Sequence, residues 1–381
     1  MRTGLVVPIA FALGLAIAAA PAERPRARDL GVPFEGTPGP LNAITDVAGV
    51  EVGQVTLVSG EGRLEVGRGP VRTGVTAIHP RGKASNDPVF AGAFALNGNG
   101  EMTGLSWLSE SGFLEGPVVL TNTHSVGLAR DAVIAWQNRR GPGAQPWGLP
   151  VVAETWDGWL NDINGFHVKE AHVFQALDEA RGGPVEEGGV GGGTGMVCFE
   201  LKGGIGTSSR RLQARHGGYT LGVLVQANFG LRRQLTVAGV PLGREITEGT
   251  FRDDEAGSII IVIATDAPLL PHQLDRLARR AAMGLARTGS VAMNGSGDLF
   301  VAFATANRGL ALATSAVSAT VLPNEAMNPL FTATVQATEE AIVNALVRGE
   351  TMVGIDGHRV LGLPHDRLRE VLARHGRLGA P

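Results

Sequence analysis

The sequence predicts an α/β or α+β layered sandwich, because short apolar strands alternate along it with amphipathic helices. The clearest strand is 259–263, where five β-branched residues follow one another without a polar interruption, so both of its faces should be buried. The clearest helix begins at Pro271, which suits a first helical turn, and ends near Gly289. The apolar face of that helix carries Leu274, Leu277, Ala281 and Leu285.

Other elements continue this alternation on both sides of the pair. Strands are expected at 118–120, 196–202, 219–228 and 299–305. Helices are expected at 126–139, 168–181 and 324–347, with a last helix from Pro364 onward. The segment 23–40 is rich in Pro, Gly and Arg and should form an extended arm. The 55 glycines, roughly twice the average usage of ~7%, should serve tight turns and close backbone approaches.

Composition excludes some classes of partner. The 381 residues carry a net charge of −3, and their Lys and Arg side chains form no cluster along the chain. Binding to nucleic acid or to an anionic membrane surface is therefore not indicated. Cys198 is the single cysteine, so an intramolecular disulfide is impossible, and its apolar neighbours favour a buried side chain over a nucleophile.

The first 22 residues have the pattern of a secretory signal peptide. Arg2 supplies a positive start, 5–19 supply an apolar segment, and Ala20-Pro21-Ala22 fits a small-residue cleavage site before Glu23. The apolar segment is shorter than the ~20 residues that span a bilayer. We therefore expect export to the periplasm or the medium, with an uncleaved anchor or a wrongly assigned start as the alternatives.

Three common kinds of site are not supported by the motifs. The run GGVGGGTG at 188–195 contains no G-x-G-x-x-G and no P-loop lysine, so turns explain it better than a nucleotide. No H-E-x-x-H motif is present, which leaves a zinc hydrolase unsupported. The G-x-S-x-G elbow of α/β-hydrolases is absent as well.

Seven segments, in order and over nearly all of the mature chain, together resemble one family. They are LNGNGEMTG (96–104), LTNTHSVG (120–127), PVVAETWDGWLND (150–162), GGGTGMVCFELKGGIGTSSR (191–210), QANFG (226–230), GSIIIVIATDAPLLPHQL (257–274) and NGSGDLFVAFATAN (294–307). The set is similar to the L-aminopeptidase/D-alanine esterase-amidase family, which also contains the β-peptidyl aminopeptidases.

The resemblance implies a fold and an activity. The fold would be a four-layer αββα sandwich like that of the N-terminal-nucleophile hydrolases, with different connectivity. A single catalytic domain would cut itself into 23–257 and 258–381 and then release N-terminal residues from short peptides, amides or esters with a free amine. It also implies oligomers of cleaved α/β heterodimers, and neither a metal nor an organic cofactor.

The position that matches the family's nucleophile is Ser258, so the implied cleavage lies between Gly257 and Ser258. Cleavage would free an α-amine with a reference pKa of about 7.7–8.0, and one residue would then supply both nucleophile and base. Gly257 lacks a Cβ, so its backbone could adopt a strained conformation that exposes its carbonyl to the serine hydroxyl.

Five further residues match family positions. Asn228 matches an oxyanion donor, and Ser296 with Asp298 match a Ser-x-acid pair that orients the amine. Some members have Glu at the position of Asp298. Glu154 matches a carboxylate that receives the substrate's ammonium group. Trp156 stands where some members have Tyr and, lacking a hydroxyl, is expected to form a stacking wall.

Two other functions remain as alternatives. An acyltransferase like the ornithine acetyltransferases would use an N-terminal threonine, but Thr250, the nearest candidate, is followed by charged residues that do not form a strand pattern. A non-enzymatic exported binding protein would use Gly257-Ser258 merely as a turn before the buried strand, and its chain would stay intact.

Overall fold

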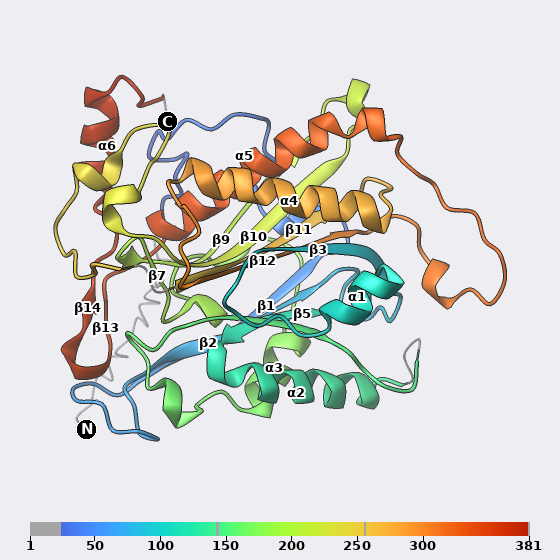
Figure 1. Ribbon diagram of the computed structural model, residues 1–381, viewed down its shortest axis with the longest axis horizontal. Coiled ribbons are helices and arrows are strands. Elements are labelled where there is room, and N and C mark those ends of the chain that lie inside the picture. Colours follow the sequence, from blue (N-terminus) through green and yellow to red (C-terminus); the bar gives the residue numbers. More distant parts are fainter. Residues whose placement is uncertain (1–23, 142–144, 255–256, 380–381) are drawn as a thin grey trace, which may run out of the picture.

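The computed structural model describes residues 24–141, 145–254 and 257–379, and the expected signal peptide lies outside them. Two β-sheets pack face to face, and a pair of helices covers the outer face of each sheet (Figure 1). Helices α2 (Val126–Arg139) and α3 (Glu170–Asp178) cover the smaller sheet. Helices α4 (Pro271–Arg287) and α5 (Asn328–Val347) cover the larger sheet. This is the expected αββα sandwich.

The strands of the two sheets come from interleaved parts of the chain. The smaller sheet has the order β1 (Glu51–Ser59), β2 (Val71–His79), β5 (Val118–Asn122) and β6 (Val151–Thr155). The larger has the order β4 (Phe113–Leu114), β3 (Val89–Gly98), β12 (Ser296–Ala304), β11 (Gly257–Thr265), β10 (Thr220–Asn228) and β9 (Gly204–Arg211). Short pairs are β7 (Val197–Cys198) with β8 (Leu201–Lys202), and β13 (Met352–Val353) with β14 (Arg359–Val360); α1 (Leu105–Ser111) and α6 (His365–Arg374) complete the fold.

Strand β11 has no polar interruption because its two faces meet two different apolar cores. Ile259, Ile261 and Ile263 pack into the core beneath α4 and α5. Ile260 and Val262 pack into the core between the sheets. All five side chains are fully buried, which confirms the expectation for 259–263. By the same alternation, the side chain of the residue before Ile259 projects toward the smaller sheet.

The expected strand at 196–202 is wrong. The chain instead makes a tight hairpin, β7 to β8, in which Phe199 and Glu200 both have positive φ values, 51° and 57°. The buried Glu200 carboxylate stabilises this turn by accepting hydrogen bonds from the backbone N–H of Phe251, Arg252 and, at 2.9 Å, Arg232. Such long-range bonds override the strand propensity of MVCF, and they cannot be read from local sequence.

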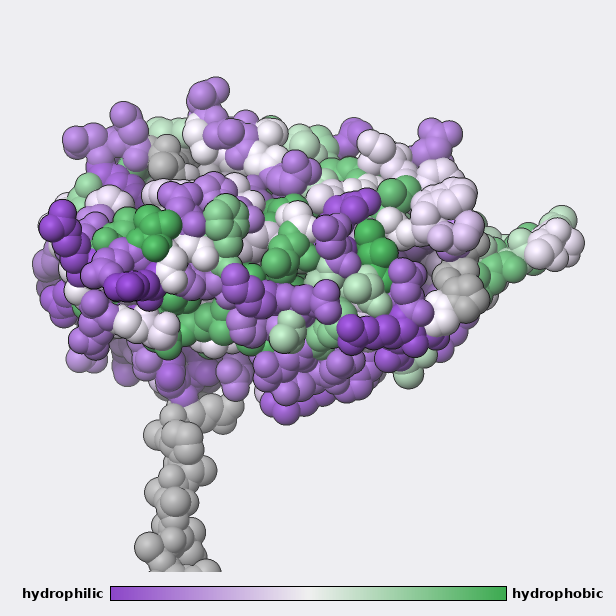
Figure 2. Space-filling model, turned by 90° about the horizontal axis from the view of Figure 1, so that it is seen from below, coloured by the Kyte–Doolittle hydropathy of each residue, from purple (hydrophilic) through white to green (hydrophobic). Residues whose placement is uncertain are grey.

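Two segments outside the sandwich differ in how they are held. The arm at 24–40 is tied down, because Arg26 pairs with Glu187 at 2.6 Å and Arg28 with the buried Glu340 at 2.7 Å. By contrast, the loop 305–327 between β12 and α5 projects from the body (Figure 1, Figure 2). Its exposed apolar side chains are Leu312, Val317 and Val321. Within the described ranges, no helix has the length and apolar content to cross a membrane.

Candidate active site

The predicted residues meet where β11 begins, at one end of the central strands of the larger sheet. Strand β10 runs antiparallel to β11, with Asn228 directly opposite Ser258. Strand β12 runs parallel to β11 on its other side and places Gly297 opposite Ser258. Asn228 is the last residue of β10 and Ser258 is the second residue of β11, so the sheet register alone brings the two side chains together.

The Ser258 hydroxyl is nearly buried, with the residue 5% exposed. Its Oγ accepts a hydrogen bond of 3.2 Å from the backbone N–H of Gly297. A Cβ on Gly297 would lie 2.4 Å from the carbonyl oxygen of Asn99, so only glycine fits there. The close approach of the Gly297 backbone to the Asn99 backbone therefore fixes the direction from which the Gly297 N–H donates to Ser258 Oγ.

Gly257 is needed for a reason that differs from the expectation. It lies in β11 and is not one of the glycines with left-handed φ values, so the expected strained conformation is not what the structure shows. A Cβ at this position would instead lie 1.9 Å from the carbonyl oxygen of Asn228. Any other residue before Ser258 would push β10 and β11 apart.

The Asn228 amide is held at both ends, and the residue is 1% exposed. Its Oδ1 accepts a hydrogen bond of 2.7 Å from Val197 N–H, and its Nδ2 donates to the Trp156 carbonyl at 2.8 Å. These two partners fix which end is oxygen and which is nitrogen. An amide nitrogen carries two hydrogens, so one remains beyond the bond to Trp156. Trp156 thus contacts the site through its backbone, and the stacking wall expected from its indole stays a prediction.

Ser296 and Asp298 lie beside the backbone of Ser258 and not beside its hydroxyl. Both are fully buried, and Ser296 Oγ donates to Asp298 Oδ1 at 2.7 Å. Along β12 they alternate in step with Phe300, which packs beneath α4 and α5, so they face the helix-covered side of the sheet. Asp298 is opposite Ile259 in the register, one residue beyond the position opposite Ser258.

Glu154 reaches the same site from the smaller sheet. It is 3% exposed, and its carboxylate accepts hydrogen bonds from Glu101 N–H at 2.9 Å and from the Thr123 hydroxyl. Burial raises the pKa of Glu154 in spite of these two bonds. Gly100 lies between Glu154 on the smaller sheet and Gly297 on the larger one. A Cβ on Gly100 would lie 3.2 Å from Glu154 Oε1 and 3.3 Å from Gly297 Cα.

Several residues near the site were not singled out from the sequence. Thr123 and Gly297 stand inside the quoted motifs LTNTHSVG and NGSGD, and Lys202 stands inside ELKGG. Their position within those motifs was the available signal. Asp157 is fully buried, accepts a hydrogen bond of 3.1 Å from Asn161 Nδ2, and has a pKa raised by burial to about 7.

The alternative nucleophile and a metal centre gain no support. Thr250 is exposed in the connection between β10 and β11 and does not begin a strand. Across 24–141, 145–254 and 257–379, no group of three His, Cys, Asp or Glu side chains is placed to hold a metal ion.

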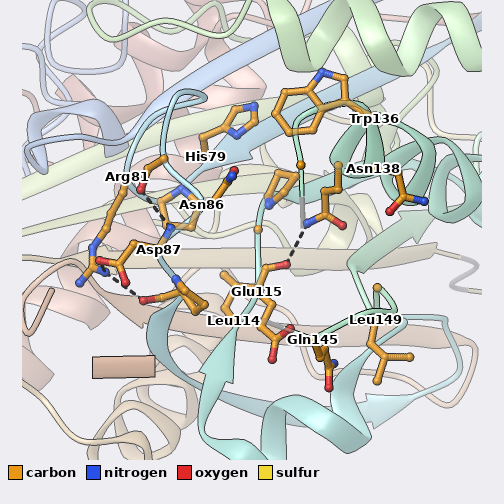
Figure 3. A pocket seen from close by; sticks show the side chains of 18 of the residues that line it. His79, Arg81, Asn86, Asp87, Leu114, Glu115, Trp136, Asn138, Gln145 and Leu149 are labelled. Atoms are coloured by element: carbon orange, nitrogen blue, oxygen red, sulfur yellow. Dashed lines mark hydrogen bonds and ion pairs between the residues drawn. The ribbon is translucent and has the colours of Figure 1, made fainter. Parts of the chain in front are cut away.

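A cavity of about 450 Å³ lies at the opposite end of the smaller sheet (Figure 3). It is lined by the end of β2 and the residues after it, by residues before β5 and before β6, and by the end of α2, whereas the site around Ser258 adjoins the other end of β5. Two pairs of its polar groups bind each other: Arg81 pairs with Asp87, and Gln137 Nε2 donates to the Glu115 carbonyl at 3.2 Å. Burial lowers the pKa of His79 to about 4, so this imidazole is neutral at pH 7. None of the predicted site residues lines the cavity.

Comparison with known proteins agrees with this geometry. The profile of peptidase family S58 matches residues 42–360. The β-peptidyl aminopeptidase BapA of Sphingosinicella microcystinivorans is 54% identical over 99% of both chains. Among solved structures, the L-aminopeptidase D-Ala-esterase/amidase of Ochrobactrum anthropi, described as a new variant of the Ntn hydrolase fold, superposes with a TM-score of 0.87 at 48% identity, covering 93% of this chain and 100% of that one. A Burkholderia β-aminopeptidase gives 0.86 at 51%, covering 93% and 99%.

These matches extend over far more than half of the chain, and they join a sequence profile, a full-length relative and superposable structures. The chain therefore belongs to peptidase family S58 and is an aminopeptidase with a variant of the N-terminal-nucleophile hydrolase fold.

Proposed function

We propose that this aminopeptidase activates itself by cutting between Gly257 and Ser258, and that Ser258 then releases N-terminal residues from short peptides, amides or esters. The observation that carries the proposal is the position of Ser258 at the start of a buried strand, with Asn228 opposite and Gly297 N–H on its Oγ. The names of the relatives, β-peptidyl aminopeptidase and L-aminopeptidase D-Ala-esterase/amidase, support this class of substrate.

Self-cleavage needs only groups already present in the chain, together with one water. Ser258 Oγ attacks the carbonyl carbon of Gly257, and the C–N bond breaks as the Ser258 nitrogen takes the proton. The Ser258 amine is then free, and the resulting ester joins Gly257 to Ser258 Oγ; water hydrolyses this ester to a Gly257 carboxylate and the Ser258 hydroxyl. The single catalytic domain then consists of 23–257 and 258–381.

In turnover, the freed amine takes the proton from Ser258 Oγ as the hydroxyl attacks the substrate carbonyl. The remaining hydrogen on Asn228 Nδ2 is suited to bind the oxyanion that forms. Asp298, held by Ser296, lies opposite Ile259, one residue along from Ser258, and in this scheme it orients the amine and stabilises its protonated form. The acyl group passes to Ser258 Oγ, the leaving amine takes the proton, and water completes hydrolysis.

Glu154 supplies a preference for substrates with a free amine. A buried carboxylate is costly to ionise, as its raised pKa indicates, and a substrate ammonium would compensate that cost directly. Because Glu154 stands on the other sheet, across Gly100 from Gly297, it can hold the amino end of a substrate whose carbonyl lies at Ser258.

The first prediction tests the nucleophile. Ser258→Ala removes the hydroxyl that both self-cleavage and acyl-enzyme formation need, so both should vanish together. Ser258→Cys keeps a nucleophile and should retain slow cleavage with reduced turnover. Mass spectrometry of each variant and release of p-nitroaniline from an alanine anilide give the two readouts. Ser290→Ala, at the buried serine of another Gly-Ser pair, 289–290, is the matched control and should be cut and active. A cleaved, active Ser258→Ala protein would refute the assignment.

The second prediction tests substrate recognition. The Glu154→Gln enzyme should still cut itself. Its kcat/KM for free-amine substrates should fall by an amount that corresponds to about 2–5 kcal/mol of binding free energy, the usual cost of removing one partner of a buried charge pair. An N-acetylated substrate should already be poor for the parent enzyme. Glu101→Gln, an exposed carboxylate on the residue whose backbone contacts Glu154, is the control and should change little. Equal turnover of acetylated and free substrates would contradict the role.

The same assignment fixes a pH dependence. Glu154 must be ionised to bind an ammonium, and its pKa is raised, so KM should rise as pH falls through a value above that of an ordinary carboxyl group. Glu154→Gln should lose this acid limb.

We propose further that residues 1–22 are removed on export to the periplasm or the medium, and that cleaved pairs assemble into an oligomer. The signal-peptide pattern supports export, and the apolar side chains of the projecting loop 305–327 support assembly with a second copy. Cell fractionation and light scattering test the two claims. Deletion of 310–319 should lower the mass of the assembled protein in solution. A cytosolic protein would contradict export, and a mature mass equal to one cleaved pair would contradict assembly.

A further inference from the structure

Lys202 is a buried cation whose hydrogen-bond partners are backbone carbonyls. The residue is fully buried at the end of β8, and its Nζ donates to the carbonyls of Met196 at 2.9 Å, Gly203 at 2.8 Å and Gly193 at 3.2 Å. None of the salt bridges among the described residues includes it. Burial lowers its pKa to about 7. Placing an ammonium here costs free energy, and a well-packed apolar side chain would avoid that cost.

One of its acceptors leads directly to the active site. The Met196 carbonyl and the Val197 N–H are the two ends of a single peptide group. Lys202 Nζ binds the oxygen of that group, and its N–H donates to Asn228 Oδ1 at 2.7 Å. Asn228 Nδ2 in turn donates to the Trp156 carbonyl at 2.8 Å. A continuous chain of hydrogen bonds thus runs from the lysine, through one peptide group, to the amide opposite Ser258.

Such a chain has a direction and a chemical effect. A cation at the Met196 oxygen draws electron density from the peptide group and makes the Val197 N–H a stronger donor. That donor, acting on Asn228 Oδ1, draws density from the side-chain amide and leaves the Nδ2 hydrogens more positive. Each bond in a chain of this kind strengthens its neighbour by about 10–30%. The same contacts also hold the amide plane fixed relative to Ser258.

We propose that Lys202 is a positioning residue for catalysis, which orients and polarises Asn228 through the Met196–Val197 peptide group so that Nδ2 binds the oxyanion more strongly. The inference rests on the proposed function, in which Asn228 is the oxyanion donor. Lys202 touches neither the substrate nor Ser258 in this scheme. Its effect therefore reaches the reaction only through Asn228.

A double-mutant cycle separates this role from a purely structural one. Lys202→Met, Asn228→Ala and the double variant are compared with the parent for kcat and KM on an alanine anilide, and for the rate of self-cleavage of the precursor. Lys202→Met should lower kcat by on the order of 10-fold at unchanged KM, less than the 10²–10³ typical for removal of an oxyanion donor. On the Asn228→Ala background it should cause no further loss, because the group it acts through is gone.

Two further variants serve as controls for the double-mutant cycle. Thr194→Val removes another buried hydrogen bond of the same turn, from Thr194 Oγ1 to the Gly191 carbonyl at 2.6 Å, without touching the Met196–Val197 peptide group. Any loss it causes should be the same on both backgrounds. Lys202→Arg, which keeps a cationic donor, should recover part of kcat. If Lys202→Met does not accumulate as folded protein, Lys202→Gln takes its place in the cycle.

The outcomes distinguish the two proposals. Equal fractional losses from the Lys202 substitution on both backgrounds, or a change in KM alone, would overturn the role of Lys202 and leave Asn228 intact. An Asn228→Ala enzyme with parental kcat would instead remove Asn228 from the proposed mechanism, and the inference about Lys202 would fall with it.

Discussion

The site depends on the close contact between the end of β10 and the start of β11. Asn228 and Ser258 face each other in the register, and there is no room for a side chain on Gly257, where a Cβ would lie 1.9 Å from the Asn228 carbonyl oxygen. Two apolar cores hold β11 from both sides, so its first residues cannot shift without disturbing both. The position of the Ser258 hydroxyl is thus determined by sheet geometry and core packing, and not by a flexible loop.

Around that hydroxyl, the fold buries groups that would be more stable in water. The pKa of Glu154 is raised, that of Asp157 is raised to about 7, and that of Lys202 is lowered to about 7, in each case mainly by burial. Perturbed groups of this kind cluster at functional sites, where preorganised charges and dipoles act in a dry environment. The large cores on both sides of the two sheets offset the cost of burying them.

Much of the fold could be predicted from local sequence, whereas the site could be predicted only in part. The helix at 126–139 and the two-sided burial of 259–263 follow from periodicity, and both are confirmed. The hairpin at Phe199 and Glu200 was missed, because carboxylate bonds to distant backbone stabilise it. The motif ELKGG marked the place of Lys202, but the contacts of its side chain could not be predicted, because its partners are backbone carbonyls, which carry no residue identity.

Sequencing the N-terminus of the smaller polypeptide in the purified protein tests the central claim most directly. The account predicts two polypeptides, of which the smaller runs from 258 to 381 and begins SIIIV, with Ser258 carrying a free α-amine. A smaller polypeptide that begins at any other residue, or a single uncut chain that hydrolyses an amino acid anilide, would contradict the claim that Ser258 is an N-terminal nucleophile.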